Sequence, residues 1–277
     1  MIISIASGKG GTGKTTVAVN LALSLDKDLL FLDCDVEEPN ANIFLRTRLY
    51  ETEYVTMDIP RVDEGRCDYC GRCAEFCEYN ALAVLSSKVM VFPELCHSCG
   101  GCKLVCPRDA ISWEERVIGR VEHGVKDNIS FYQGVLNIGE SQATPIIRYL
   151  KNKMSNGRDV IIDSPPGTSC PVIESINESN YCILVTEPTP FGLHDLKLAV
   201  DLVRHLSIPF GVIINRYGIG DKRVDLYCQT ERIPVLERIP HDEEIAKLYS
   251  NGKPFVEELG EWRVRFQRVY ELIEASI

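Results

Sequence analysis

Short apolar runs alternate with amphipathic stretches along most of the 277-residue chain. Continuous apolar runs bounded by turn-forming residues predict buried strands, and apolar positions at helical spacing predict helices. The expected strands are 1–6, 29–33, 159–163, 181–186, 210–215 and 234–239. The expected helices are 14–25, 145–154, 191–206, 242–250 and the C-terminal segment. Such strands separated by helices imply an α/β fold with a doubly wound, mainly parallel sheet.

This pattern is interrupted between about Tyr54 and Trp113, where cysteine, glycine and charged residues dominate. A long loop would explain the change, but a structureless loop of roughly 60 residues is rare in a compact domain. We therefore expect an inserted domain over residues 57–117. The α/β domain is then built from residues 1–56 and 118–277.

The C-terminal segment spaces Trp262, Phe266, Val269, Tyr270 and Ile273 along one face of a helix. Such a helix can lie on a membrane surface or pack on the domain, and packing is favoured. The net charge of −10 argues against nucleic acid and anionic membranes as partners. The chain opens without a signal-peptide pattern, so a cytoplasmic protein is expected.

Eight of the twelve cysteines form two identical runs in the inserted segment. Each run reads C-x2-C-x2-C-x3-C, and each cysteine of the second run lies 29 positions after its counterpart. Three closely spaced thiolates can hold three irons of a cubane cluster, and the fourth cysteine then reaches the neighbouring cluster. Structural zinc sites are the alternative, although tetrahedral zinc commonly uses two separated C-x2-C pairs. The duplication favours two [4Fe–4S] clusters in halves related by a pseudo-two-fold axis.

In these runs the segment resembles the bacterial-type two-cluster ferredoxins, which implies an inserted α+β domain. The resemblance also implies a crossed arrangement, in which each cluster takes three cysteines from one run and one from the other. The first cluster is assigned Cys67, Cys70, Cys73 and Cys106, and the second Cys96, Cys99, Cys102 and Cys77. Glu78 stands where these ferredoxins usually have proline, whereas Pro107 keeps that pattern in the second run.

A glycine-rich loop follows the first predicted strand and opens the first predicted helix, which is the setting of a phosphate-binding loop. It comprises Gly8, Lys9, Gly10, Gly11, Thr12, Gly13, Lys14, Thr15 and Thr16. Its backbone N–H groups can form an anion nest at the N-terminus of the helix. We expect Lys14 to contact the β- and γ-phosphates, Thr15 to ligate Mg²⁺ and Thr16 to bond the α-phosphate.

Lys9 adds a second lysine early in the loop, which is the mark of the deviant Walker A class. The chain therefore resembles MinD, ParA, Mrp and the nitrogenase iron protein. In that family the early lysine crosses a dimer interface to the partner's nucleotide, so the resemblance implies a homodimer or a heterodimer with a paralogue. There Lys9 would offset charge that develops on the transferred phosphoryl group. A solvated loop lysine is the alternative.

Further positions of this family lie after predicted strands. Asp35 matches the switch I aspartate that orients the attacking water, whereas Asp33 is expected to be structural. Asp163 matches the Walker B aspartate that holds Mg²⁺ through water, and Gly167 matches the glycine whose N–H senses the γ-phosphate. The predicted magnesium site comprises Thr15, Asp35 and Asp163. The predicted catalytic residues are Lys9, Lys14 and Asp35.

The base side of the site is expected at two more loops. Asn215 matches the family's adenine-contacting asparagine, and Pro240, His241 and Asp242 resemble its second adenine-side loop. Cys170 stands where the nitrogenase iron protein has a cluster ligand. The second cysteine of that pattern has no evident counterpart in the sequence, so a semi-buried structural thiol is favoured over a bridging cluster.

Taken with the cysteine runs, these motifs predict a dimeric ATPase whose ATP cycle is coupled to electron transfer through two [4Fe–4S] clusters. The expected cofactors are ATP or ADP, Mg²⁺ and the clusters, and the expected partners are redox proteins. An iron–sulfur carrier ATPase of the Mrp type is one alternative, although the C-x-x-C that such carriers use near the end of the ATPase domain has no counterpart in this sequence. A positioning scaffold that uses the C-terminal helix is another.

Overall fold

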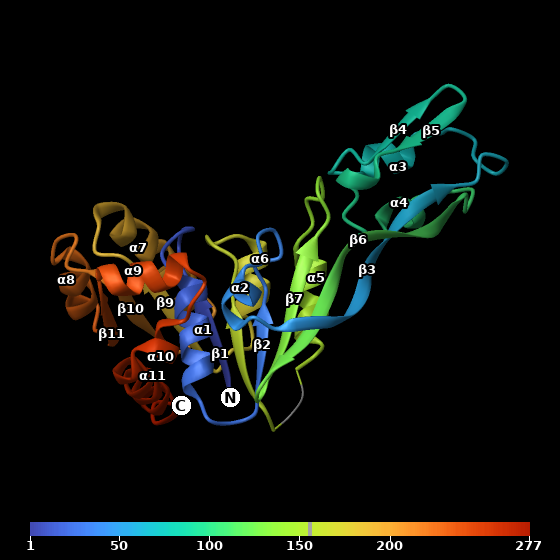
Figure 1. The fold of residues 1–277 in the computed structure, drawn as a ribbon. Coiled ribbons are helices and arrows are strands. Elements are labelled where there is room, and N and C mark those ends of the chain that lie inside the picture. Colours follow the sequence, from blue (N-terminus) through green and yellow to red (C-terminus); the bar gives the residue numbers. More distant parts are fainter. Residues whose placement is uncertain (155–156) are drawn as a thin grey trace.

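A nine-stranded sheet forms the body of the molecule in the computed structural model, which describes residues 1–154 and 157–277. The strand order is β11-β10-β9-β1-β8-β2-β7-β6-β3 (Figure 1). Neighbouring strands from β11 to β7 are parallel, whereas β6 is antiparallel to both β7 and β3. The bounds are β1 (Ile2–Ala6), β2 (Leu29–Asp33), β3 (Arg48–Val62), β6 (Ile111–Lys126), β7 (Ile129–Leu136), β8 (Asp159–Asp163), β9 (Tyr181–Thr186), β10 (Phe210–Tyr217) and β11 (Val235–Pro240).

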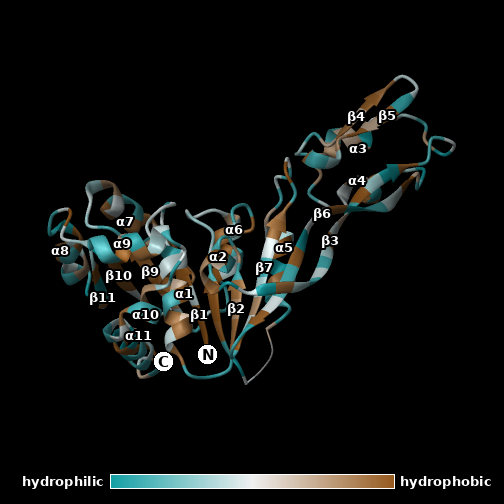
Figure 2. Ribbon diagram, in the orientation of Figure 1, coloured by the Kyte–Doolittle hydropathy of each residue, from teal (hydrophilic) through white to brown (hydrophobic). Residues whose placement is uncertain are grey.

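Side chains alternate between the two faces of the central strands and build a core on each face. In β2, Phe31 packs with α1, α10 and α11, whereas Leu30 and Leu32 pack with α5 on the other face. In β1, Ala6 packs with α6, α7 and α8. The helices are α1 (Lys14–Ser24), α2 (Ala41–Leu45), α5 (Thr144–Lys151), α6 (Cys170–Ile176), α7 (Pro190–His205), α8 (Arg223–Thr230), α9 (Glu243–Ser250), α10 (Phe255–Glu258) and α11 (Gly260–Glu274). Figure 2 shows the resulting apolar centre of the sheet.

The C-terminal helix α11 packs on the body of the protein, as its spacing of apolar residues predicts. Its apolar face is buried against α1 and α10, and the rings of Trp262, Phe266 and Phe255 pack against one another. Among residues 1–154 and 157–277, no helix is both long enough and apolar enough to span a membrane.

All the strands and helices expected from the apolar pattern are present, with ends that differ by at most a few residues. The structure adds three strands to the sheet, β7, β6 and β3. Strands β3 and β6 carry many exposed charged side chains, such as Glu114 and Glu115, so they do not read as apolar runs. This antiparallel extension makes the sheet mixed at one edge.

Strands β3 and β6 continue beyond the sheet as a two-stranded ribbon that carries residues 63–110 away from the body (Figure 1). At the far end of the ribbon Val62 pairs with Ile111. The expected domain boundaries at 56/57 and 117/118 fall within these two strands. The segment at the end of the ribbon, residues 63–110, is here called the cysteine unit. It contains α3 (Arg72–Phe76), β4 (Leu82–Leu85), β5 (Lys88–Val91), η1 (Pro93–Leu95) and α4 (Gly101–Leu104).

The two halves of the cysteine unit repeat the same backbone geometry 29 residues apart. The Asp63 N–H donates to the Ala110 carbonyl at 2.8 Å, and the Phe92 N–H donates to the Ala81 carbonyl at 2.8 Å. Equivalent residues also adopt left-handed backbone conformations, namely Tyr69 and Ser98, Gly71 and Gly100, and Asn80 and Asp109. Each half thus begins beside the end of the other, because the duplicated sequence folds around a pseudo-two-fold axis.

Candidate functional site

The glycine-rich loop lies at the carboxyl edge of the sheet, between β1 and α1. Gly11 and Gly13 have φ values of +78° and +96°, which residues with a side chain rarely adopt. These turns bring Lys14 to the first position of α1, where only 6% of it is exposed. The loop and the helix N-terminus therefore form an anion nest with a lysine held against it.

This loop borders a cavity of about 470 Å³, within the size range of ligand sites in proteins. Many of the sequence-predicted residues line the cavity, namely Gly10, Gly11, Gly13, Lys14, Thr15, Thr16, Asp35, Asn215, Pro240, His241 and Asp242. The other predicted residues of this site, Gly8, Lys9, Thr12, Asp163 and Gly167, lie outside the lining. The fold therefore gathers residues from four loops at one point, because all these loops follow parallel strands.

Two residues outside the lining fix the loop in place. The Thr12 carbonyl accepts a hydrogen bond of 2.8 Å from Asn215 Nδ2, which ties the loop to the end of β10. A Cβ on Gly8 would lie 2.1 Å from the Asp195 carbonyl oxygen in α7, so glycine alone fits there. These contacts support the shape of the nest. Direct contact with a ligand would come from the loop residues that line the cavity.

Asp163, at the end of β8, is completely buried, and its two carboxylate oxygens have no hydrogen-bond partner within the part of the chain that the structure describes. Burial raises the pKa of Asp163 to about 7, although the nearby Thr15 hydroxyl and the charge of Lys14 oppose the shift. An orphaned buried carboxylate beside Thr15 and Lys14 is a group that a hydrated cation would satisfy. The donor set of Thr15, Asp35 and Asp163 therefore fits Mg²⁺.

Asp33 and Asp35 differ in their surroundings. Asp33 is fully buried, and its carboxylate accepts backbone N–H bonds from Asp35, Asn40 and Ala41 at 3.0–3.2 Å. It therefore shapes the loop after β2, which agrees with the structural role expected for it. Asp35 lines the cavity, and burial raises its pKa to about 6.

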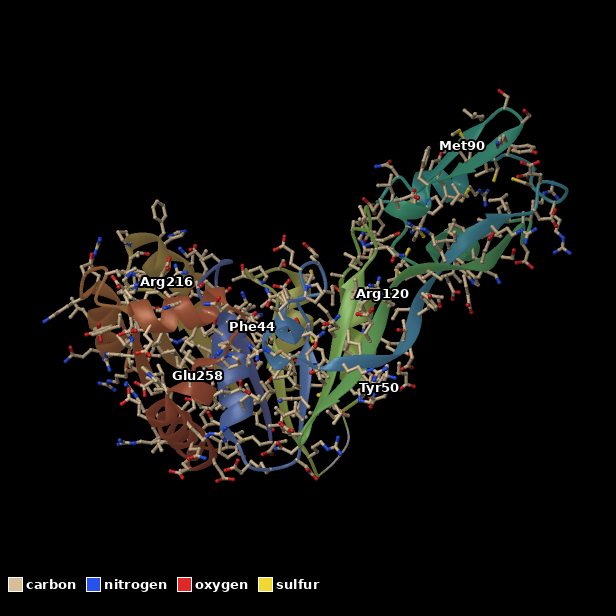
Figure 3. All side chains as sticks on the ribbon, in the orientation of Figure 1. Phe44, Tyr50, Met90, Arg120, Arg216 and Glu258 are labelled. Atoms are coloured by element: carbon tan, nitrogen blue, oxygen red, sulfur yellow. The ribbon has the colours of Figure 1, made fainter. Side chains whose placement is uncertain are left out.

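Lys9 and Gly167 are engaged within the chain. Lys9 Nζ lies 2.5 Å from Glu187 Oε1, and Arg216 contacts the other oxygen of Glu187 at 3.1 Å (Arg216 is labelled in Figure 3). The Gly167 N–H donates to the Ser7 carbonyl at 3.0 Å. Contact of either group with a phosphate would require these bonds to break.

The far wall of the cavity comes from β11 and α9. Asp242 Oδ1 caps α9 by accepting N–H bonds from Glu244 and Ile245 at 2.7 and 3.1 Å, so its carboxylate is committed to the helix. Sequence reasoning missed the remainder of the lining, namely Glu38, Asn40, Pro166, Arg216, Ile219, Ile245, Ala246, Tyr249 and Phe255. Ile245 and Tyr249 are four residues apart on one face of the predicted helix 242–250, and that spacing was the available signal.

The cysteine unit contains two further cavities, and each is lined by four cysteines. One cavity is lined by Cys67, Cys70, Cys73 and Cys106, and the other by Cys77, Cys96, Cys99 and Cys102. Each set thus takes three cysteines from one run and the last cysteine from the other. Figure 3 shows sulfur atoms gathered between the strands and helices of this unit. The four cysteines that line the cavity containing Cys67 are here called the first cysteine set, and the four that line the cavity containing Cys96 are called the second.

Backbone N–H groups point at sulfur in both sets. The Sγ atoms of Cys67 and Cys96 accept from the residue two positions on, and those of Cys77 and Cys106 from the residue four positions on, at 3.3–3.4 Å. Such bonds stabilise thiolates and tune clusters. Within the described ranges, no three His, Cys, Asp or Glu side chains converge closely enough to ligate one ion. The four sulfurs of each set instead line a small cavity.

The remaining four cysteines are isolated from these sets. Cys34, Cys182 and Cys228 are buried, and burial raises the pKa of each thiol, so they are structural thiols. Cys170 is exposed at the start of α6 rather than semi-buried as expected.

Comparisons with known proteins agree with this geometry. A profile of the family described as the CobQ/CobB/MinD/ParA nucleotide binding domain matches residues 3–255. An uncharacterized protein of Methanocaldococcus jannaschii is 30% identical over 95% of this chain and 97% of its own length. The iron–sulfur cluster carrier protein of Pyrococcus abyssi is 24% identical over 92% of this chain and 78% of its own. The structure of the septum site-determining protein MinD with Mg-ADP from Pyrococcus horikoshii covers 98% of this chain and 95% of its own, with a TM-score of 0.60 and 22% identity.

Proposed function

The chain belongs to the CobQ/CobB/MinD/ParA nucleotide-binding family and is a P-loop ATPase, and from this premise we propose that it is an ATP-dependent iron–sulfur cluster carrier. The observation that carries the proposal is the pair of cavities, each lined by four cysteines of crossed origin, in a chain with a nucleotide cavity. The relatives that bear the name iron–sulfur cluster carrier protein point to the same class of function.

In this proposal ATP occupies the cavity at the carboxyl edge of the sheet. The loop N–H groups from Gly10 to Thr16 bind the phosphates, and Lys14 places a positive charge among them. The base lies toward Asn215 and the β11–α9 side, where Tyr249 and Ile245 add apolar surface. Recognition of the phosphates thus comes mainly from backbone, and recognition of the base from side chains.

Hydrolysis needs a metal ion and an oriented water. Thr15 and Asp163 would hold Mg²⁺, with Asp35 close by, and the ion supplies positive charge to the β- and γ-phosphates. Asp35 would accept a hydrogen bond from the attacking water and so aim it at the γ-phosphate. The Gly167 N–H would release the Ser7 carbonyl and turn to the γ-phosphate, which makes the segment after β8 a nucleotide-dependent switch.

Lys9 would complete the site of a second subunit, in a homodimer or a heterodimer with a paralogue. In the structure its charge is neutralised by Glu187, which also holds Arg216. Release of Lys9 from Glu187 would therefore accompany dimer formation. Hydrolysis would then depend on the dimer, because the charge that stabilises the transferred phosphoryl group comes from the partner subunit.

The cysteine unit would be a bacterial-type ferredoxin domain that binds two [4Fe–4S] clusters as cargo. Three features support this assignment: the crossed cavities, the paired N–H···S bonds and the pseudo-two-fold repeat. One cysteine of each set, Cys70 and its counterpart Cys99, is exposed to solvent. An acceptor thiol could replace such a ligand, which is the first step of cluster transfer.

Electron transfer through resident clusters is the second candidate. It is favoured by the close likeness of the two cavities, which would place two similar clusters in one small unit. It is also favoured by the sequence, in which the C-x-x-C of Mrp-type carriers has no counterpart near the C-terminal end. The two candidates differ in whether the clusters leave the protein.

A transfer assay distinguishes them. Anaerobically reconstituted protein is mixed with the apo form of a [4Fe–4S] enzyme such as aconitase, with ATP and Mg²⁺, and the regained enzyme activity is followed. We expect ATP to accelerate cluster transfer from the parent protein. ATP should not accelerate transfer from the Lys14→Ala variant loaded with the same amount of iron. Clusters that remain bound through many turnovers of ATP and reduce reversibly would contradict the carrier proposal and favour electron transfer.

A further inference from the structure

A loop of the ATPase body touches the cysteine unit at the second cysteine set. This loop, residues 137–143, connects β7 to α5 and extends toward the unit (Figure 1). Ser141 Oγ donates to the Glu94 carbonyl oxygen at 3.3 Å. Gln142 Nε2 lies 2.8 Å from Nε2 of His97, close enough to donate to it. The unit is therefore attached to the body by this loop as well as by the ribbon.

His97 belongs to the wall of the second cavity. It follows Cys96 in the chain and lines the cavity with the four cysteines of the second set. Its ring stacks on Tyr79, which also lines this cavity, with centroids 3.5 Å apart and planes 8° from parallel. A shift of Gln142 would therefore move a ring that encloses the second set.

Arg116 of β6 strengthens the same contact. Its guanidinium donates to the Pro93 carbonyl at 3.2 Å and lies 3.7 Å from Glu94, and it also pairs with Glu140 of the loop. The segment that leads into Cys96 is thus held from two elements of the body. Both elements meet at the base of the unit, where the ribbon leaves the sheet.

The other end of the loop is bonded to the nucleotide site. The Leu136 N–H, at the end of β7, donates to the Val36 carbonyl at 2.8 Å. Val36 follows Asp35, which lines the nucleotide cavity, and a Cβ on Gly134 would lie 2.6 Å from Val36. Movement of the segment after β2 would therefore displace β7, because Val36 is in close contact with Gly134 and Leu136.

The pseudo-two-fold repeat shows that this attachment is specific to one half. The counterpart of His97 is Asp68, 29 residues earlier, and the counterpart of Tyr79 is Arg108, 29 residues later. Those two side chains bond each other at 2.9 Å across the first cavity's wall, within the unit. The same two positions thus serve internal pairing in one half and attachment to the body in the other.

We propose that the loop of residues 137–143 is a positioning element through which the nucleotide state acts on the second cysteine set and leaves the first unaffected. The inference rests on the proposed function, since it needs ATP in the nucleotide cavity and clusters in the unit. The γ-phosphate orders the segment that contains Asp35 and Val36, and β7 passes the change to the loop. Because coupling is reciprocal, the state of the second cluster changes nucleotide affinity by the same factor.

Hydrogen exchange of the full, cluster-loaded chain tests this inference with and without a non-hydrolysable ATP analogue. We expect the analogue to slow exchange over residues 93–99, with no change over the equivalent residues 64–70. The Ser141→Ala/Gln142→Ala variant should lose the effect at 93–99 and keep the protection of residues 8–16. Ile138→Ala is the matched control, because Ile138 lies in the same loop and is fully exposed; it should behave like the parent.

A redox titration gives an independent readout. One of the two midpoint potentials should shift with the analogue, and the shift should disappear in the double variant. Equal responses of both halves, or an unchanged response in the double variant, would overturn the inference while the proposed function stands. Protein that fails to bind about eight irons would instead overturn the proposed function, and the inference with it.

Discussion

Three buried or half-buried aspartates show how surroundings set the role of a side chain. Two of them, Asp33 and Asp163, end strands of the sheet, and Asp159 begins one. Asp33 is surrounded by backbone donors and shapes a loop, whereas Asp163 is buried with both oxygens unpartnered in the described structure. Asp159 begins β8 at the opposite edge and is held by Lys27 at 2.6 Å and by Tyr270 at 2.7 Å. The carboxylates of Asp33 and Asp159 are satisfied by the fold, whereas that of Asp163 is the one proposed to bind Mg²⁺.

Asp159 allows a test of stability. Burial opposes its charge, but hydrogen bonds from Lys27, the N-terminal amine and Tyr270 lower its pKa to about 2. A lowered folded-state pKa contributes stability above the unfolded value of about 3.8, and that stability is lost as the pH falls toward 2. Asp159→Asn should therefore lower the free energy of unfolding by about 1–2 kcal/mol at pH 7, the lower end allowing for solvent screening.

The measurement is urea unfolding of the two proteins between pH 3 and pH 7. The difference between them should be constant above about pH 5 and should shrink below pH 4. Asp26→Asn is the control, because Asp26 pairs with Arg263 in an exposed ion pair, and such pairs contribute less than about 1 kcal/mol. An Asp159 variant as stable as the Asp26 variant would show that the cluster around Asp159 contributes nothing beyond surface pairing.

At the scale of elements, the repeat in the cysteine unit explains why the sets are crossed. Each half starts beside the end of the other, so Cys106 reaches the first run and Cys77 reaches the second. The strand pairs β3–β6 and β4–β5 hold these ends together, because each pair joins the start of one half to the end of the other. Crossing is therefore a consequence of strand pairing.

Paired cysteine substitutions test the crossing. Cys67→Ser/Cys106→Ser removes two ligands from one set and should leave one intact cluster, with about four irons per chain. Cys67→Ser/Cys77→Ser removes two cysteines of one run, which belong to different sets, and should damage both clusters. Iron and sulfide analysis with EPR of the reduced proteins gives the result. The reverse outcome, one intact cluster only in the second variant, would mean that each run holds its own cluster.

At the scale of the whole molecule, the nucleotide cavity and the cysteine unit are separate sites on one sheet. The cavity lies where parallel strands end, and the unit lies beyond the antiparallel edge (Figure 1). Lys9 is the predicted point of contact with a second subunit, and it is held by Glu187 in the single chain. Assembly and hydrolysis should therefore change together.

Substitutions of the two loop lysines test that connection. Lys14→Ala should abolish ATP binding, because Lys14 is the positive charge that the phosphate nest holds at its centre. Lys9→Ala should bind ATP nearly as the parent does and lose hydrolysis and ATP-dependent dimer formation. Calorimetry, phosphate release and analytical ultracentrifugation report the three properties. If Lys9→Ala hydrolyses ATP at the rate of the parent, the lysine has no role across a dimer interface.

The sequence by itself determined the parts of the protein that depend on local order along the chain. The apolar runs placed six strands of the sheet, since a buried strand must be apolar on both faces. The loop from Gly8 to Thr16 predicted the phosphate nest, because the loop's shape depends on its own glycines. The 29-residue repeat predicted two equivalent sets of four cysteines. All of these are encoded by residues that are close in sequence.

Only the tertiary structure decided which distant residues meet. The charged strands β3 and β6 have no apolar run to reveal them, because ribbon strands expose one or both faces to solvent. The pairing of Lys9 with Glu187 and the contact of Gln142 with His97 join residues that are far apart in the chain. Such contacts depend on strand order and loop direction, which no local pattern encodes, and the second of them attaches the cysteine unit to the ATPase body.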